Sequence, residues 1–79
     1  MTLDELTSQQ QLVEQSLDDS LQLAEPDCDR AVGHRDAVCD LADRICRLIS
    51  EQRSSTTSAC DDGRRRCERV KQRYDDACR

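Results

Sequence analysis

Six cysteines are spaced as a palindrome, and this spacing restricts the fold more than any other feature of the sequence. They stand at positions 28, 39, 46, 60, 67 and 78, separated by steps of 11, 7, 14, 7 and 11 residues. A helix turns by about 100° per residue, so steps of 7 and 11 keep the cysteines of each half on one narrow stripe. Each cysteine also has a mate equidistant from residue 53, as two antiparallel helices require. The spacing predicts a helical hairpin with three disulfides: Cys28–Cys78, Cys39–Cys67 and Cys46–Cys60.

The composition makes such cross-links necessary. Of the 79 residues, 35% are hydrophobic and 37% are charged, and the chain has no Trp or Phe and one Tyr. A chain of roughly 70–80 residues rarely obtains more than about 3–5 kcal/mol from one apolar core. Without cross-links this balance favours disorder. We expect residues 1–79 to form a single, disulfide-rich domain.

The disulfides also indicate an oxidising location, which is the periplasm, the cell surface or the secreted space. Residues 1–27 contain no Lys or Arg and no continuous apolar run, unlike an export signal. We therefore expect a form from which a signal has been removed, with membrane anchoring only through a missing lipidated N-terminus. No stretch is apolar enough to predict a transmembrane segment.

The first predicted helix covers residues 2–24. Thr2 and Glu5 form a capping box, and Pro26 ends the helix because the residue before a proline avoids the helical region. Apolar residues follow one heptad seam, which Gln10 and Ser20 interrupt, and three further leucines widen it. The seam consists of Leu3, Leu6, Val13, Leu17 and Ala24, and the widening residues are Leu12, Leu21 and Leu23.

Two more helices are predicted over residues 27–52 and 59–78, joined by a polar loop and linked by the disulfides. One face of the second helix carries the cysteines with Ala31, Ala42 and Ile49. Its other apolar stripe needs a second partner, for which the first helix is the candidate; this stripe consists of Val38, Leu41, Ile45 and Leu48.

Two single residues of the hairpin carry further expectations. Gly33 lies within the second helix, where glycine costs about 1 kcal/mol relative to alanine, so we expect a neighbouring backbone to approach closely there. Tyr74, the only aromatic residue, should lie between the two outer disulfides. The predicted fold is all-α: a disulfide-linked antiparallel hairpin with an N-terminal amphipathic helix, together a three-helix bundle.

The charge is divided unevenly along the chain. Residues 1–27 have a net charge of −7 and residues 28–79 a net charge of +2, which gives −5 overall. An acidic first helix lying on an arginine-rich hairpin is therefore expected. The acidic total and the lack of stacking aromatics argue against nucleic-acid binding.

Two surfaces are candidates for binding a protein partner: the apolar seam of the first helix and the basic run of arginines from Arg64 to Arg73 in the third helix. The first helix either packs inside the bundle or pairs with another chain, including a second copy, through its leucines. The candidate partner-binding residues are Leu3, Leu6, Val13, Leu17, Arg64, Arg65, Arg66, Arg69 and Arg73.

No pattern in the sequence predicts a catalytic centre. His34 is the only histidine, and no Ser or Cys is spaced to form a nucleophile pair with it. Zinc sites usually pair cysteines two to four residues apart, a spacing that is missing here, although facing thiolates could hold Cu(I). We expect no enzyme activity, no cofactor and no metal, with a thiolate copper- or zinc-binding protein as the alternative.

The second half of the chain resembles the cysteine-rich helical hairpins of small exported bacterial proteins, many of them predicted lipoproteins of unknown function. The resemblance lies in the stretch C-D-L-A-D-R-I from Cys39 to Ile45, in Cys46, and in the later C-x₆-C-x₁₀-C from Cys60 to Cys78. The resemblance implies an envelope location and transfers no catalytic residue. The twin C-x₉-C hairpins are a more distant likeness with different spacing.

Together these features predict a non-enzymatic interaction or structural module of the cell envelope or secreted space. A stapled helical rod would present charged faces to a protein partner. The second alternative, beside thiolate metal binding, is a small accessory subunit that docks through its N-terminal helix.

Overall fold

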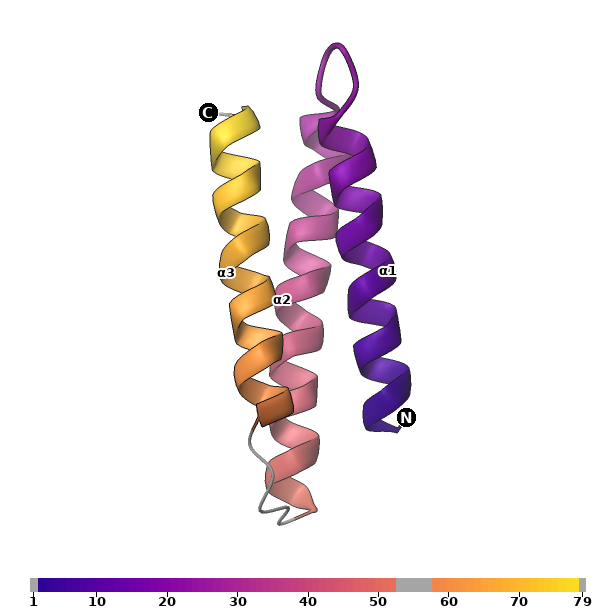
Figure 1. Cartoon of the computed structure of the whole chain (residues 1–79), viewed down its shortest axis with the longest axis vertical. Helices are drawn as coiled ribbons and strands as arrows, with labels where there is room; N and C mark the ends of the chain where they lie inside the picture. Colours follow the sequence, from indigo (N-terminus) through magenta and orange to yellow (C-terminus); the bar gives the residue numbers. More distant parts are fainter. Residues whose placement is uncertain (1, 53–57, 79) are drawn as a thin grey trace.

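A computed structural model describes residues 2–52 and 58–78 of the chain. Three helices run antiparallel to their neighbours along a rod of 45 × 19 × 14 Å: α1 (Leu3–Leu21), α2 (Cys28–Glu51) and α3 (Ser58–Cys78). In Figure 1, α2 lies between the other two helices, and α1 packs mainly on α2. The described residues contain no strand. The all-α three-helix prediction is confirmed.

The caps of the first two helices follow the sequence. The Thr2 hydroxyl oxygen accepts a hydrogen bond from the Glu5 N–H at 3.2 Å, and the Asp27 carboxylate accepts one from the Arg30 N–H at 3.2 Å. Each bond satisfies a backbone donor that has no partner inside its helix. The Thr2 N-cap predicted from the sequence is confirmed.

The predicted end of the first helix, at residue 24, is too late. The helix ends at Leu21, and the Gln22 N–H makes the last helical bond, to the Asp18 carbonyl at 3.0 Å. The chain then needs residues 22–27 to reverse direction, and the Asp27 N–H closes this loop on the Ser20 carbonyl at 3.0 Å. The turn therefore takes residues that the apolar pattern assigned to the helix.

All three disulfides join α2 to α3 in the predicted pairing. The Cα–Cα distances are 5.8 Å for Cys28–Cys78, 4.7 Å for Cys39–Cys67 and 4.6 Å for Cys46–Cys60. They lie near one end, the middle and the other end of the paired helices. Between Cys28–Cys78 and Cys39–Cys67, the Arg35 guanidinium stacks over the Tyr74 ring at 4.6 Å from its centroid. This stacking adds a cation–π contact between α2 and α3.

The apolar core consists of two clusters in which α2 takes part. Leu6 of α1 packs against Leu41, Ile45 and Ile49 of α2. Further along the rod, Leu17 of α1, Val38 of α2 and Val70 of α3 are fully buried together. The second apolar stripe of α2 therefore meets the first helix, as expected, and α1 belongs to the bundle.

The two glycines play different parts. Gly63 of α3 is buried, and a Cβ there would lie 3.5 Å from the Ala42 Cα and 3.6 Å from the Ile45 Cδ1. A side chain larger than that of alanine would push α3 away from α2 between the Cys39–Cys67 and Cys46–Cys60 disulfides. The expectation for Gly33 is wrong within this chain, because a Cβ at Gly33 meets nothing within 4 Å.

We predict that reducing the three disulfides abolishes most of the helical structure. α3 contributes few buried residues, so the covalent links supply much of its attachment, and loss of even one native disulfide typically costs about 2–5 kcal/mol. Circular dichroism at 222 nm in dithiothreitol should fall by about half or more relative to the oxidised protein. An unchanged spectrum would show that the apolar core suffices.

We also predict that Gly33→Ala raises the free energy of unfolding by about 0.5–1 kcal/mol, because alanine has the higher helix propensity and the position is open. Urea unfolding of the oxidised protein measures this change. The matched variant Gly63→Leu should instead lower stability by about 1–3 kcal/mol through overpacking. A loss of stability in Gly33→Ala would contradict the open geometry.

Candidate functional site

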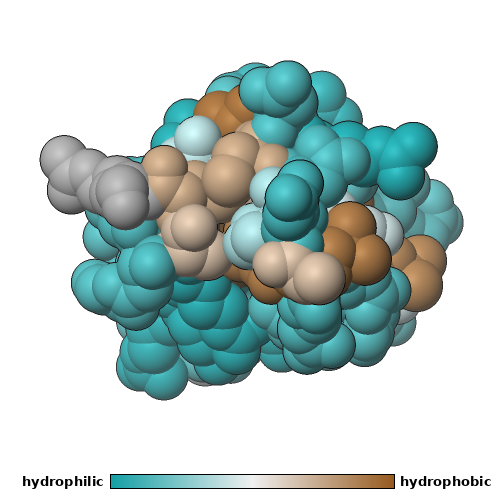
Figure 2. Space-filling model, turned by 90° about the horizontal axis from the view of Figure 1, so that it is seen from above, coloured by the Kyte–Doolittle hydropathy of each residue, from teal (hydrophilic) through white to brown (hydrophobic). Residues whose placement is uncertain are grey.

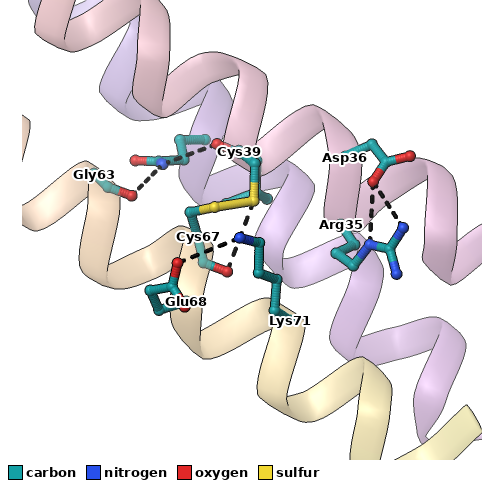
Figure 3. The surroundings of a disulfide bond; sticks show 9 residues. Arg35, Asp36, Cys39, Gly63, Cys67, Glu68 and Lys71 are labelled. Carbon is teal, nitrogen blue, oxygen red and sulfur yellow. Dashed lines mark hydrogen bonds and ion pairs between the residues drawn. A yellow bond between two sulfur atoms is a disulfide. The ribbon is translucent and has the colours of Figure 1, made fainter. Parts of the chain in front are cut away.

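A buried glutamine joins all three helices. Gln10 of α1 is 1% exposed, and its side-chain Nε2 donates to the Val38 carbonyl of α2 at 3.2 Å and to the Gly63 carbonyl of α3 at 3.1 Å. Figure 3 shows the Gly63 carbonyl one turn of α3 from the Cys39–Cys67 disulfide. A buried amide must be hydrogen-bonded to be tolerated. Gln10 therefore fixes the height of α1 on the hairpin.

One turn further along α1, Glu14 is surrounded by arginines of α3. Its side chain is 10% exposed, and its carboxylate oxygens lie 3.3 Å from Arg66 Nη1 and 2.7 Å from Arg69 Nη2. Arg73 Nη1 lies 3.7 Å from Glu14 and 2.7 Å from the Asp18 carboxylate. Charge-assisted bonds of this kind are stronger than neutral ones. The expected contact between an acidic first helix and an arginine-rich hairpin is confirmed.

These contacts account for most of the predicted partner-binding residues. Leu6 and Leu17 lie in the core, and Leu3 and Val13 pack partly buried against it. These four seam residues therefore face the hairpin, whereas Ala24 lies exposed in the turn after α1.

The basic run is also largely engaged within the molecule. Three of its arginines bind the carboxylates of α1, namely Arg66, Arg69 and Arg73. Arg65 is exposed and pairs with Asp62 of its own helix at 3.2 Å, and Arg64 is exposed beside the Cys39–Cys67 disulfide. The arginines that bind α1 also keep part of their surface in solvent, with side-chain exposures of 26% for Arg66, 50% for Arg69 and 41% for Arg73.

The sequence interpretation missed the roles of Gln10 and Glu14. In the sequence, Gln10 was interpreted only as a polar interruption of the apolar seam. Its position on that seam nevertheless indicated that its side chain would be buried. Ser20 interrupts the seam in the same way; it is buried, and its hydroxyl donates to the Ser16 carbonyl at 2.9 Å. Leu12 and Leu23, expected to widen the apolar stripe, are instead 68% and 56% exposed.

The exposed leucines lie along hollows between α1 and α2. One hollow of about 370 Å³ has Leu12 and Val13 on one side and Ala37 and Leu41 on the other. A second, of about 680 Å³, is lined at the loop end by Leu23, Gly33 and the half-buried His34, among others. Figure 2 views this end of the rod, where apolar residues lie among hydrophilic ones.

The arrangement of the cysteines and the charged residues can be compared with the alternative hypothesis of a thiolate metal-binding protein. All six sulfurs are in disulfides, so the oxidised protein offers no thiolate ligand. Among residues 2–52 and 58–78, no group of three or more His, Cys, Asp or Glu side chains could hold a metal ion. Thiolate metal binding would therefore require the reduced chain.

No helix in the described part of the chain is both long and apolar enough to cross a bilayer. Comparison with known proteins finds no matching family model, and neither the curated proteins nor the solved structures give a significant match. The three disulfides are consistent with an oxidising extracellular or periplasmic location.

We predict that Glu14→Gln lowers the free energy of unfolding by about 1–2 kcal/mol. The substitution leaves three arginines clustered without their shared carboxylate, while the solvent exposure of the arginines limits the loss. Chemical denaturation measures the change, and hydrogen exchange should show faster opening of α1.

The matched control is Asp19→Asn, on the exposed side of the same helix, where the carboxylate accepts one bond from Gln15 at 3.5 Å. This variant should stay within about 0.5 kcal/mol of the parent protein. Equal effects of the two substitutions would mean that the arginine cluster contributes nothing specific.

Proposed function

We propose that the protein is a non-enzymatic interaction module of an oxidising compartment in the cell envelope or secreted space. In this function, a disulfide-linked helical rod presents its outer faces to a protein partner. The cross-links keep those faces in place without a large core, which suits an environment outside the cytosol.

The observation that carries this proposal is the use made of the buried polar side chains. A catalytic centre needs polar groups directed at a substrate, whereas Gln10 donates to two backbone carbonyls and Glu14 binds three arginines. Ser20 likewise donates to a carbonyl of its own helix. Gln10 and Glu14 hold the helices together, and because all three groups are bound within the molecule, the outer surface is the part that meets other molecules.

The module holds α1 and the hairpin differently. The disulfides join α2 and α3, while α1 attaches through its buried leucines, Gln10 and Glu14. A partner would therefore meet a combined surface of α1 and α2 whose geometry the hairpin supports. The proposal places recognition on the outside of the bundle and not on the buried leucine seam.

Site-directed photocrosslinking in the organism of origin tests the proposal. A photoreactive amino acid is placed at Leu12 of α1, Ser50 of α2 or Lys71 of α3, all exposed positions on different parts of the surface. We expect a discrete adduct with another protein from at least one position, because a specific partner contacts a defined face. No adduct from any position would overturn the proposed function.

A further inference from the structure

The two hollows lie one after the other along the same pair of helices, and together they are called the α1–α2 groove. On α2, the residues Arg30, Gly33, Ala37 and Arg44 follow steps of three, four and seven, which place them on one stripe of a helix. The facing stripe of α1 consists of Gln9, Leu12, Ser16 and Asp19. From Arg30 to Arg44 the groove follows 14 residues of α2, or about 21 Å at 1.5 Å per residue. This length matches about four turns of a docked helix.

The groove carries the large exposed apolar side chains of the described residues. Leu12, 68% exposed, lines one hollow, and Leu23, 56% exposed, lines the other. Apolar side chains along a groove between two helices are the usual anchor points for an amphipathic helix. Each leucine shares its hollow with a small residue of α2, Ala37 or Gly33. A partner can therefore approach the α2 backbone between the leucines.

Gly33 supplies an independent indication of an approaching partner. Glycine within a helix costs about 1 kcal/mol relative to alanine, and nothing in this chain needs the space, since a Cβ would meet no atom within 4 Å. The missing side chain instead deepens the groove. The close neighbour expected at this glycine is then a part of another molecule.

The charges along the groove select the kind of partner. Its lining contains four aspartates and two arginines, Asp19, Asp27, Asp29, Asp40, Arg30 and Arg44. Arg30 lies 3.8 Å from Asp27 and Arg44 lies 3.1 Å from Asp40, so these four charges are paired. Asp19 and Asp29 leave the groove negative, in a chain whose net charge is −5. A second copy docked through its own groove would bring like charges together, whereas a cationic segment would be attracted.

We propose that the α1–α2 groove binds a basic amphipathic helix of another protein, which becomes the fourth helix of the bundle. This inference rests on the proposed function and names its docking surface and the chemistry of its partner. The apolar side of the partner covers Leu12 and Leu23, and a small-residue contact forms at Gly33. Lysines or arginines at its edges face Asp19 and Asp29.

Binding of two designed helical peptides tests the inference. One is an 18-residue amphipathic peptide of leucine and lysine, and the other has glutamate in place of every lysine. Fluorescence anisotropy with the oxidised protein should give at least about tenfold tighter binding of the lysine peptide. Equal affinities, or no binding of the lysine peptide, would overturn the inference.

Three variants locate the binding. Leu12→Gln preserves helix propensity and should weaken binding of the lysine peptide about tenfold, as loss of a buried leucine contact implies. Gly33→Gln fills the groove, so it should also weaken binding while it raises the melting temperature. Ser50→Gln, exposed and outside the groove, should change neither. Equal affinities of Leu12→Gln and the parent protein would contradict the proposal.

The photocrosslinking experiment separates failure of this inference from failure of the proposed function. We expect the adduct from position 12 to contain a segment with basic residues flanking apolar ones. An adduct with a second copy of this chain, or adducts from positions 50 or 71 alone, would overturn the groove as the docking site. An adduct with another protein from position 50 or position 71 would still support the proposed function as an interaction module.

Discussion

The register between α2 and α3 is the constraint on which the rest of the structure depends. Three sulfur bridges set it at three heights, with Cα atoms 4.6–5.8 Å apart. Gly63 of α3 packs against Ala42 of α2 in this contact, where a Cβ on the glycine would lie 3.5 Å from the Ala42 Cα. The same register brings the Val38 and Gly63 carbonyls within reach of a single amide, that of Gln10. The position of α1 therefore follows from the cross-linked pair.

The attachment of α1 combines apolar and polar contacts that depend on one another. Leu6 and Leu17 exclude water on the α2 side, and this exclusion strengthens the bonds that Gln10 and Glu14 make toward α3. A helix with leucines alone could slide along the hairpin, because apolar packing has little directional preference. The amide and the carboxylate give the contact its register. A chain without Trp or Phe obtains a defined third helix in this way.

The sequence predicted those parts of the fold that repeat with the period of a helix. The cysteine spacing contained the pairing, and the stripes of α2 indicated which faces are buried, because both are properties of regular helices. The specific bonding partners of Gln10 and Arg66 were out of reach for the same reason. Periodicity gives the direction of a side chain but not the group that it meets. Arginines that bind an internal carboxylate look the same in sequence as arginines that wait for a partner. The exposure of Leu12 depended on how far α1 is rotated on α2, which no single-helix pattern determines.

The placement of the outermost disulfide has a mechanical consequence. Cys28–Cys78 closes a loop over a sequence separation of 50 residues, which contains the other two disulfides. Tension that enters the chain before Cys28 and leaves after Cys78 passes directly across this covalent bond and bypasses the hairpin. α1 lies outside the loop that this disulfide closes, so it lengthens under such load as it peels from its neighbours. The pair of α2 and α3 would then behave under force as an inextensible link.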